Sequence, residues 1–418
     1  MTGAIPLQGL PLNTPITKGM ELRRVTLVFP ILAILLILSL FGCGETSAPT
    51  ELTTKTEKTI EDALQPALGS QMTLEPHIPA IRLTSTPWVS ACKPTSERTE
   101  IQMNPMKTPR VSAPKPTNEK TLRQVNPKPN LSDGHPVFLS KWGTHGKGDG
   151  QFNSPHDVAV ALDGSVYVVE RNNHRIQKFT SAGVFVSKWG TEGSEGGEFY
   201  FPEGVAVGPG GSVYVAEESN DRIQKFNCEG TIIGTWGTEG SGTGQFNQAH
   251  DVSVGPQGSV YVSDSYNHRI QKFTSDGVFV TEWGTKGSGD GQFKNRTRVA
   301  VAPDGSVYVS DMYNNRVQKF TSEGVFVTKW GTQGSGAGEF LWPRGIAMEP
   351  DGGVYVVDTH NHRIQKFSSE GVFVTKWGTK GSGDGQFINP YDVAVGPNGA
   401  IYVADPENNR IQKFLAEQ

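Results

Sequence analysis

Short runs of alternating hydrophobic and polar residues recur through the chain from Val137 onward. In each repeat, one run ends in Trp-Gly and another reads Arg-Ile/Val-Gln-Lys-Phe. The tryptophans are Trp142, Trp189, Trp236, Trp283, Trp330 and Trp377, and the arginines are Arg175, Arg222, Arg269, Arg316, Arg363 and Arg410. Both series advance by 47 positions at every step. A fixed period of about this length indicates a β-propeller or a solenoid.

Each repeat contains four short strand-like runs. In the third repeat they are Asp251–Val254, Ser259–Asp264, Arg269–Phe273 and Val278–Trp283. Turn signals rich in Gly, Asn and Ser separate the runs, and none of the runs has the length or the period of a helix. Four antiparallel strands in a repeat of this length form one propeller blade. The pattern therefore predicts an all-β fold, a six-bladed β-propeller.

The repeats are interrupted within a blade at both ends of the pattern. The last repeat supplies three strands, Asp392–Val395, Ala400–Asp405 and Arg410–Phe414, and no fourth. An unmatched run, Val137–Trp142, precedes the first repeat. Pairing of Val137–Trp142 with Arg410–Phe414 would complete the sixth blade and cover an edge strand that is otherwise open to wrong pairing. We therefore predict that the ring closes between these two segments.

The repeat resembles the NHL repeat. The segment Pro155–Phe179, PHDVAVALDGSVYVVERNNHRIQKF, carries the resemblance, as do Ala249–Phe273 and the corresponding segments of the other four repeats. The resemblance extends from Val137 to Phe414. It implies a propeller that serves mainly as a binding platform, with its function determined by site residues rather than by the fold.

The region before the repeats has the layout of an exported protein. Arg23 and Arg24 precede an apolar run that ends at Cys43, which predicts a secretory signal over residues 20–43. The ending Leu-Phe-Gly-Cys resembles a bacterial lipobox, which implies lipidation of Cys43 and stable attachment through acyl chains. An uncleaved anchor helix is the alternative, because the run is close to membrane-spanning length. Residues 1–19 are interpreted as a misassigned start.

A linker is predicted between the signal and the repeats. Residues 44–136 are rich in Thr, Pro, Lys, Glu and Ser and show no sustained period, so we interpret them as disordered. Since the Arg pair of the signal stays on the cytoplasmic side, the linker and the propeller (residues 137–418) are expected in the cell envelope, outside the cytoplasm. The propeller is expected to be a monomeric domain held away from the membrane.

Charge and cysteine content exclude two classes of function. From Val137 onward the chain has 24 Lys and Arg residues and 31 Asp and Glu residues, a net charge of −7. This charge repels phosphate, so nucleic acid is not an expected partner. The three cysteines, Cys43, Cys92 and Cys228, are too few and too scattered for a disulfide framework or a zinc module.

One face of the propeller is expected to carry the candidate site. Strand direction alternates within a blade, so the start of the first strand and the turn between the second and third strands lie on the same face, here called the top face. Two positions before the first Val or Ile of strand one, the six repeats differ in sequence. These residues, expected around the mouth of the central channel, are His156, Glu203, His250, Thr297, Arg344 and Tyr391.

Two imidazoles and a carboxylate around a channel could hold a divalent ion, zinc or calcium. Peptidyl-hydroxyglycine amidating lyases are six-bladed relatives that place zinc-binding His residues on alternate blades, and His156 and His250 are similar to that arrangement. The third place is occupied by Arg344, which cannot ligate a metal. The other interpretation is that both His residues are ordinary strand-start residues hydrogen-bonded to a neighbouring loop, with no cofactor.

A second set of acids ends strand two of every repeat, five positions before the Arg of strand three. These acids are Glu170, Glu217, Asp264, Asp311, Asp358 and Asp405. Such a carboxylate can cap the N–H groups of the turn that follows and pair with the Arg across the hairpin. Because all six repeats keep the acid, we interpret it as structural, with calcium binding as the alternative.

The three residues after each of these acids vary in character. They include Tyr266, Tyr313 and His360, beside Arg171 and Glu407. Exposed Tyr and His side chains on a rigid face are suited to contact with a peptide or a glycan. We therefore expect a non-catalytic domain that binds or senses a protein, peptide or glycan. The alternative function is a metal-dependent lyase or hydrolase at the channel mouth.

Overall fold

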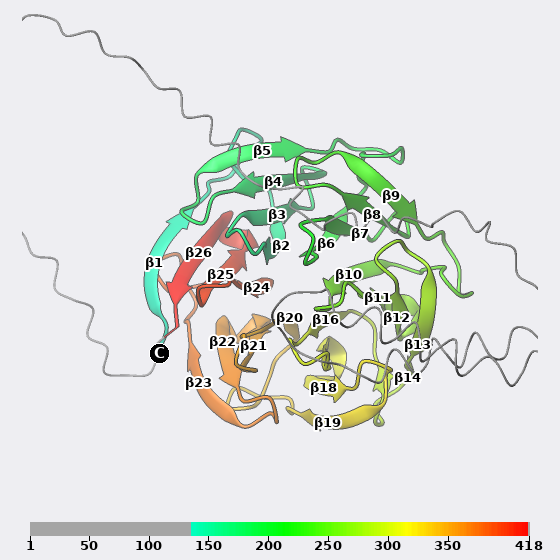
Figure 1. Ribbon diagram of the computed structural model, residues 1–418. Helices are drawn as coiled ribbons and strands as arrows, with labels where there is room; N and C mark the ends of the chain where they lie inside the picture. The colour runs from blue at the N-terminus through cyan, green and yellow to red at the C-terminus, as the bar shows by residue number, and fades with distance from the viewer. Residues whose placement is uncertain (1–134, 417–418) are drawn as a thin grey trace, which may run out of the picture. The chain divides into compact units, whose positions relative to one another are not determined.

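The structure, a computed structural model, describes residues 135–416. These residues form six four-stranded antiparallel sheets, arranged as blades around a central channel (Figure 1). The prediction of an all-β, six-bladed propeller is confirmed. The predicted signal, Cys43, Cys92 and nearly all of the predicted linker lie outside the described residues. Within residues 135–416, no helix combines the length and the apolar character needed to cross a membrane.

Blades 1 to 3 follow one another along the chain, each starting at the channel and ending at the outer rim. Blade 1 contains β2 (Pro155–Val160), β3 (Val166–Glu170), β4 (Arg175–Phe179) and β5 (Phe185–Trp189). Blade 2 contains β6 (Pro202–Val207), β7 (Val213–Glu217), β8 (Arg222–Phe226) and β9 (Ile232–Trp236). Blade 3 contains β10 (Ala249–Val254), β11 (Val260–Asp264), β12 (Arg269–Phe273) and β13 (Phe279–Trp283). The sheet orders are sequential, so each blade is a simple meander.

Blades 4 to 6 repeat the same order. Blade 4 contains β16 (Thr297–Val301), β17 (Val307–Asp311), β18 (Arg316–Phe320) and β19 (Phe326–Trp330). Blade 5 contains β20 (Pro343–Met348), β21 (Val354–Asp358), β22 (Arg363–Phe367) and β23 (Phe373–Trp377). Blade 6 contains β24 (Asp392–Val395), β25 (Ala400–Asp405), β26 (Arg410–Leu415) and β1 (Val137–Trp142).

Short elements complete the blades. Single 3-10 turns follow strand two in blades 3 to 6: η1 (Ser265–Asn267), η2 (Met312–Asn314), η3 (Thr359–Asn361) and η4 (Pro406–Asn408). A two-residue parallel ladder, β14 (Thr285–Lys286) with β15 (Gln292–Phe293), closes the Gly-rich crossover that leads into blade 4. Equivalent parallel bridges close the other crossovers.

The ring closes where the interrupted pattern predicted. Strand β1 pairs antiparallel with β26, from Val137 opposite Leu415 to Trp142 opposite Ile411. In Figure 1 the two strands lie side by side although they stand at opposite ends of the colour scale. The pairing covers the free edge of β26, and it joins two segments that are far apart in sequence.

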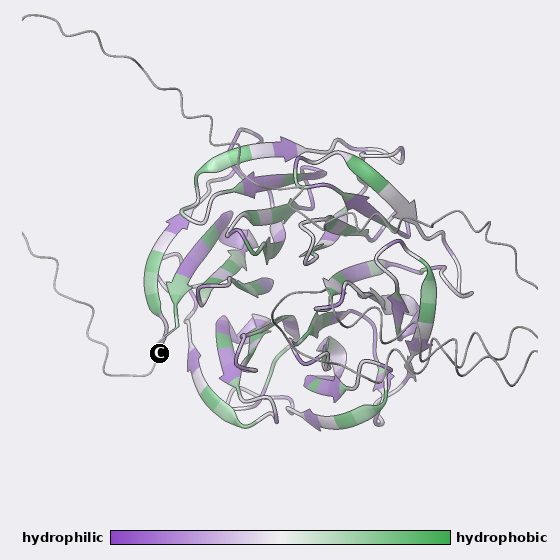
Figure 2. Cartoon of the chain, in the orientation of Figure 1, coloured by the Kyte–Doolittle hydropathy of each residue, from purple (hydrophilic) through white to green (hydrophobic). Residues whose placement is uncertain are grey.

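The hydrophobic core lies between neighbouring blades. Strand two is buried on both sides in every blade because it is packed between the preceding and the following blade. In the interface between blades 2 and 3, Tyr214 packs with Val260 and Phe273. The outer strands alternate half-buried and exposed residues, as along β19. Figure 2 shows that β19 carries both hydrophobic (green) and hydrophilic (purple) residues. Gly277 has φ +80°, and a Cβ there would lie 2.6 Å from the Trp236 indole, so this bottom turn requires glycine.

The acid at the end of strand two joins three parts of each blade. Asp311 accepts hydrogen bonds from Nε of Arg316 (3.0 Å), from Nδ2 of Asn314 (2.7 Å) and from the backbone N–H of Lys294 (3.1 Å). The predicted pairing with the Arg is therefore present. The acid makes no side-chain cap to the turn that follows it. Its N–H donor instead belongs to the segment before strand one, because the carboxylate points back toward that segment.

The Arg that pairs with this acid also donates hydrogen bonds to the Gly-rich crossover. The guanidinium of Arg316 donates to the carbonyl oxygens of Ser288 (2.7 Å), Gly289 (2.9 Å) and Gln292 (2.7 Å). Closely similar bonds occur in blades 1, 2, 5 and 6. The crossovers and the segments that begin the inner strands are thus fixed by charged side chains, which makes the top face rigid.

Substitution of Asp311 by Asn should destabilise the protein strongly. The change keeps the size of the side chain but leaves Arg316, which is only 6% exposed, without its counter-charge. We expect the free energy of unfolding, measured by urea denaturation, to fall by about 3 kcal/mol. The matched control is Asp290→Asn, because Asp290 pairs with Lys329 at the exposed rim of the same blade. The control should cost less than about 1 kcal/mol, and equal losses would contradict the structural role of the acid.

Candidate functional site

The six predicted mouth residues lie where the inner strands begin. Blade 5 has a register shift between Pro343 and Ile346, around Arg344, and bulges set the orientation of the mouth residue in three further blades. The pairing of strands one and two shifts register between Pro155 and Asp157, between Pro202 and Gly204, and between Ala249 and Asp251. The residues inside these bulges are His156, Glu203 and His250. A bulge of this kind re-aims a side chain. All three side chains are nearly buried, so they form the floor of the mouth.

Blade 4 departs from this pattern. Thr297 pairs directly with Asp311, and Arg298 pairs with Ser310, without a register shift. The backbone carbonyl of Thr297 accepts a hydrogen bond from Ser263 of blade 3 (2.6 Å). Thr297 is thus held in the blade interface, and the next residue, Arg298, supplies the side chain that reaches into the channel.

Arg298 fills the top of the channel. Its side chain is 2% exposed, and its Nη1 lies 3.1 Å from Oδ2 of Asp157, 3.5 Å from Oδ1 of Asp251 and 4.0 Å from Oδ1 of Asp392. Asp157 belongs to blade 1, which lies opposite blade 4 in a ring of six. The guanidinium therefore spans the channel, and three carboxylates from blades 1, 3 and 6 surround it.

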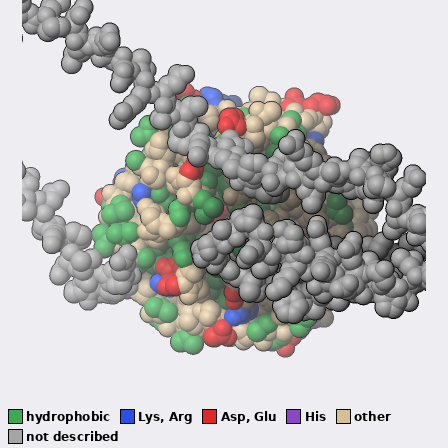
Figure 3. Space-filling model, viewed as in Figure 1, with side chains coloured by type: hydrophobic (Ala, Val, Ile, Leu, Met, Phe, Trp, Pro, Cys, Tyr) green, Lys and Arg blue, Asp and Glu red, His purple; other side chains and the backbone are tan. Residues whose placement is uncertain are grey.

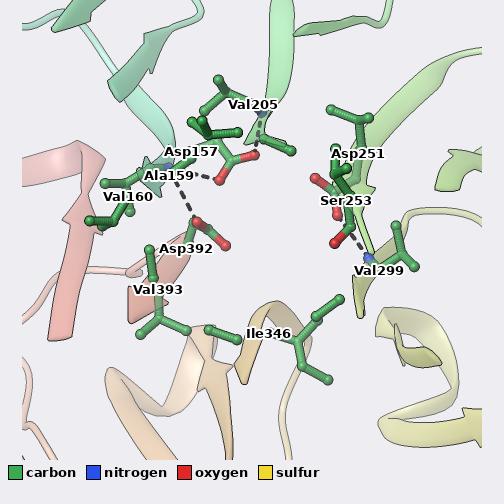
Figure 4. A pocket seen from close by; sticks show the side chains of 18 of the residues that line it. Asp157, Ala159, Val160, Val205, Asp251, Ser253, Val299, Ile346, Asp392 and Val393 are labelled. Atoms are coloured by element: carbon green, nitrogen blue, oxygen red, sulfur yellow. Dashed lines mark hydrogen bonds between the residues drawn. The ribbon is translucent and has the colours of Figure 1, made fainter. Parts of the chain in front are cut away.

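The same carboxylates bind neighbouring blades together. Oδ2 of Asp157 accepts the backbone N–H of Val205 in blade 2 (2.8 Å), and Asp251 accepts that of Val299 in blade 4 (2.7 Å). Asp392 accepts the backbone N–H of Val158 in blade 1 (3.2 Å). Figure 4 shows the three carboxylates at the channel wall, with dashed lines marking these bonds. At the corresponding positions of blades 2 and 5 the chain has Gly204 and Gly345.

Burial changes the ionisation of this cluster. Burial raises the pKa of Asp251 to about 8, against the attraction of Arg298. Burial, together with the neighbouring Asp157 carboxylate, raises the pKa of Asp392 well above its usual range. One guanidinium cannot balance three ionised carboxylates that are buried together. Protonation of part of the cluster at neutral pH follows from these directions.

Along the channel, most of the lining side chains are aliphatic, and the polar ones are Ser253 and the three aspartates. A cavity of about 230 Å³ is lined mainly by valines of the inner strands, among them Val160, Val254 and Val301. At the opposite end of the channel, a second cavity of about 290 Å³ is bordered by Leu162, Pro256 and other apolar residues. Leu162 is 74% exposed at this end. The charged side chains that line the channel therefore lie at its top, where the inner strands begin.

The predicted mouth residues of blades 1, 2 and 6 contact one another. Nδ1 of His156 lies 2.7 Å from Oε2 of Glu203, and the His156 ring packs on Tyr391 with centroids 4.3 Å apart. Glu203 also accepts a hydrogen bond from Arg171. Burial opposes ionisation of Glu203, but His156 and the cations around it hold its pKa well below the usual carboxyl value. Burial lowers the pKa of His156 despite this partner.

Two further mouth residues, His250 and Arg344, each have one buried nitrogen without a hydrogen-bonding partner among the described residues. His250 is 3% exposed, and its Nδ1 has no hydrogen-bonding partner within residues 135–416. Burial lowers the pKa of His250 to about 3, so the ring is neutral near neutral pH. Arg344 is 9% exposed, and its guanidinium carbon lies 3.7 Å from the centre of the Tyr391 ring.

An aromatic cluster lies on the top face at blades 4 and 5. Trp342 stacks on His360, with centroids 4.2 Å apart, and packs edge-on against Tyr313 at 5.6 Å. Tyr313 is 42% exposed. Trp342 has φ +59°, a conformation that is unfavourable for a bulky side chain. A related cluster at blades 1 and 2 joins Phe201 (φ +51°), Tyr200 and His174, with Arg171 4.3 Å above the Phe201 ring.

The remaining predicted residues are more isolated. Tyr266 is 43% exposed, and no other aromatic ring of the described part of the chain packs against it. Glu407 accepts a hydrogen bond from Asn389 (2.7 Å). Among residues 135–416, no group of three His, Cys, Asp or Glu side chains is placed to hold a metal ion. Metal binding by His156 and His250 therefore stays a prediction.

Sequence reasoning missed Arg298, the three channel aspartates and Trp342. The aspartates, Gly204, Gly345 and Arg298 occupy one column of the repeat, directly after the predicted mouth residues. Arg298 is the one basic residue at this position, where the other five repeats have Asp or Gly, and this difference could have identified it from the sequence. The role of Trp342 depends on its backbone conformation and on contacts across two blades, which the repeat pattern does not display.

Substitution of Asp251 by Asn should flatten the pH dependence of stability. An unfolded Asp titrates near about pH 4, whereas the folded Asp251 holds its proton up to about pH 8. The folded state therefore binds more protons between these values, and the free energy of unfolding falls as the pH rises through that window. Thermal unfolding of the parent and the variant across this range measures the effect. The exposed control Asp276→Asn should keep the parent's slope, and an unchanged slope in Asp251→Asn would refute the assignment.

Comparison with known proteins agrees with this architecture. The NHL repeat family matches residues 152–179, 199–226, 246–273, 297–320, 340–367 and 387–414. No curated protein matches the chain. Among solved structures, a protein of unknown function from Bacteroides thetaiotaomicron is similar, with 19% identity, a TM-score of 0.51, and coverage of 66% of this chain and 76% of that chain. This likeness concerns the fold alone.

Two weaker similarities have other functions in their names. An auxiliary nutrient binding protein from Bacteroides thetaiotaomicron is 16% identical, with a TM-score of 0.49, over 64% of this chain and 70% of that chain. A virginiamycin B lyase from Staphylococcus aureus is 15% identical, with a TM-score of 0.45, over 67% of this chain and 98% of that chain. Family match, blade order and ring closure together show that residues 137–415 of this chain form a six-bladed propeller of NHL repeats.

Proposed function

We propose that this chain is a membrane-tethered, extracytoplasmic NHL propeller that binds a protein, peptide or glycan on its top face without catalysis. The observation that carries the proposal is Trp342, a half-buried indole held in a left-handed backbone conformation and stacked between Tyr313 and His360. Large aromatic side chains on a rigid face are frequent centres of recognition.

The left-handed backbone conformation of Trp342 is strained for a bulky side chain. A residue with a purely structural role would be one that adopts this conformation with little strain. Every blade has a residue with positive φ just before strand one, so the conformation itself is part of the repeat. The corresponding residue in blade 6 is Asn389, and Asn tolerates this conformation with little strain. Phe201 and Trp342 are the bulky occupants of this position. Their presence is explained by what the rings contact rather than by the needs of the fold.

The two aromatic clusters are connected across the channel mouth. From Arg344, two positions after Trp342 in the sequence, the contacts run through Tyr391 to His156, then through Glu203 and Arg171 to Phe201. Arg344 and His360 are close enough to influence each other's charge, because Arg344 contributes to the lowered pKa of His360. This run of residues is called the mouth track below. A flat track with aromatic ends and charged residues at its centre suits an extended polar ligand.

Charge also favours a ligand other than nucleic acid. The region from Val137 onward has a net charge of −7. On the part of the surface visible in Figure 3, acidic and basic side chains lie interspersed and form no basic stripe. Nucleic-acid-binding surfaces require such a stripe.

The metal-dependent lyase or hydrolase remains the alternative function. It would use His156 and His250, with zinc or calcium at the mouth. Nδ1 of His156 is occupied by Glu203, and the third alternate blade presents Arg344 instead of a ligand. Stoichiometric metal in the purified protein, lost in a His156→Ala/His250→Ala variant, would favour this alternative over non-catalytic binding.

Substitution of Trp342 by Asn should abolish binding while preserving the fold. Asn relieves the strained backbone, which offsets the lost stacking, so stability should change by less than about 1 kcal/mol. Arrays of glycans and peptides, probed with the labelled full-length chain, measure binding. We expect the signal of bound members to fall at least tenfold, in line with the loss of a recognition centre worth about 2 kcal/mol.

The matched control for this test is Leu162→Asn, which replaces an exposed apolar residue at the opposite end of the channel. This control should bind as the parent does. Equal binding by the parent and Trp342→Asn would refute a top-face site, and loss of binding in both variants would place the site elsewhere.

The tether has its own test. Cys43 lies outside the described residues, and its lipidation rests on the sequence. If Cys43 is acylated, the Cys43→Ser variant should move from the membrane fraction to the soluble fraction, and the mass of its N-terminal peptide should lack the acyl chains. Cys92→Ser is the matched control and should stay in the membrane fraction. A Cys43→Ser protein that remains membrane-bound would favour the uncleaved anchor helix.

A further inference from the structure

Arg344 differs from every other arginine that the structure describes. Each of the other nine has a carboxylate oxygen within 4.0 Å, either in its own blade or across the channel. Within residues 135–416, no carboxylate lies within that distance of Arg344. Its Nε is buried and has no hydrogen-bonding partner there. Arg344 is thus a nearly buried cation without a counter-ion.

The surroundings of Arg344 do not compensate for the missing counter-ion. The guanidinium rests on the ring of Tyr391 (3.7 Å), and Arg298 is a second cation in its electrostatic neighbourhood. Glu203 also influences Arg344, but its carboxylate is already bonded to His156 and Arg171. A cation–π contact is worth about 2 kcal/mol when desolvated, less than the usual cost of burying an unpaired charge. A missing anion would account for this arrangement.

A second, independent feature points to the same place. His250 is 3% exposed at the mouth, and its Nδ1 has no hydrogen-bonding partner among the described residues. His250 and Arg344 lie within electrostatic range of each other, because Arg344 contributes to the environment of His250. The mouth thus has an uncompensated cation at blade 5 and an unsatisfied buried polar atom at blade 3. Buried polar groups are normally satisfied, so both features are consistent with a ligand that completes the site.

We propose that Arg344, with His250 and Tyr391, binds the carboxylate of an acidic sugar, a uronic-acid residue of a glycan. This inference rests on the proposed top-face binding and names its ligand class. The guanidinium is a planar fork that matches a carboxylate in two parallel hydrogen bonds. The sugar ring lies on the aromatic cluster of Trp342, Tyr313 and His360. The Cα atoms of Trp342 and Arg344 are at most about 7 Å apart, which fits one sugar ring with its carboxylate.

Charge balance favours a carboxylate over a phosphate. Arg344 supplies one positive charge that the protein does not neutralise, and a neutral His250 adds a hydrogen-bonding group without a charge. A phosphate dianion would leave an excess negative charge beside the ionised Glu203 and within reach of the channel aspartates. One unpaired cation is matched by one monoanion.

The backbone at this position favours a sugar over a peptide. Extended peptides bind through free main-chain groups at a strand edge. At the start of β20, the N–H of Gly345 already donates to the carbonyl of Tyr391 in blade 6 (2.9 Å). Side chains and flat rings therefore supply the contacts available to a ligand, and these are the groups that recognise a saccharide.

Calorimetric titration of the full-length chain tests the proposal. The probes are the disaccharides of mannuronate, glucuronate and galacturonate, each compared with its neutral parent disaccharide and with a sugar phosphate. We expect at least one uronate to bind at least tenfold more tightly than its neutral parent. Arg344→Gln should lose about 10- to 100-fold in affinity for that uronate, the range for a charge-assisted bidentate contact. Arg344→Lys should lose less, because it keeps the charge but not the fork.

A stability measurement separates ligand binding from a structural role. Because the guanidinium is unpaired, Arg344→Met should raise the thermal midpoint of the ligand-free protein while abolishing uronate binding. Lys329→Gln removes one positive charge from the outer rim of blade 4 and should change neither property. A lower midpoint in Arg344→Met together with unchanged uronate affinity would overturn the inference.

The outcomes also distinguish this inference from the proposed function. If neutral sugars, phosphosugars or peptides bind as tightly as uronates, and Trp342→Asn removes that binding, top-face recognition stands and the carboxylate site is overturned. If no member of the glycan and peptide arrays binds the parent chain, both proposals are overturned.

Discussion

The structure depends on a buried carboxylate–guanidinium pair that occurs in every blade. The acid that ends strand two holds the N–H of the segment before strand one, and its Arg holds the Gly-rich crossover. Neither ion is exposed enough to be satisfied by water, so removal of one leaves the other uncompensated. Six such pairs fix the loops of the top face in register. A rigid top face is what allows single side chains, such as Trp342 and Arg344, to determine recognition.

The buried charged groups of the channel also need partners. Each inner strand leaves polar backbone groups at the channel wall, and Asp157, Asp251 and Asp392 satisfy some of them across blade boundaries. Three buried carboxylates repel one another when they are ionised, and Arg298 reduces this repulsion. Gly204 and Gly345 complete the arrangement, because a Cβ at Gly345 would lie 2.5 Å from the Cα of Asp392. Structural needs therefore explain Arg298 and the three channel aspartates. The candidate binding residues lie above them, at the mouth.

The repeat made the fold predictable, while the site was predictable only in part. A constant spacing of Trp142, Trp189 and their equivalents fixes blade number, strand order and ring closure, since each follows from the period alone. The mouth residues were found because they vary where the scaffold does not. Arg298 escaped prediction because the column directly after the mouth residues was not compared between the blades, although Arg298 is its one basic residue. By contrast, the partner of a buried cation cannot be read from a pattern, so the isolation of Arg344 becomes visible only in three dimensions.

Blades 2 and 5 show how a repeated scaffold acquires a directional site. They lie opposite each other in the ring and carry related segments, Phe201-Pro-Glu203-Gly and Trp342-Pro-Arg344-Gly. In each segment, an aromatic residue whose backbone φ is positive stands two positions before a charged mouth residue. Glu203 is hydrogen-bonded to His156 and paired with the cation Arg171, whereas no carboxylate among the described residues pairs with Arg344. A structural requirement would act equally on both blades. Because Glu203 has a charged partner and Arg344 does not, the charged mouth residue that is free to bind a ligand lies at blade 5.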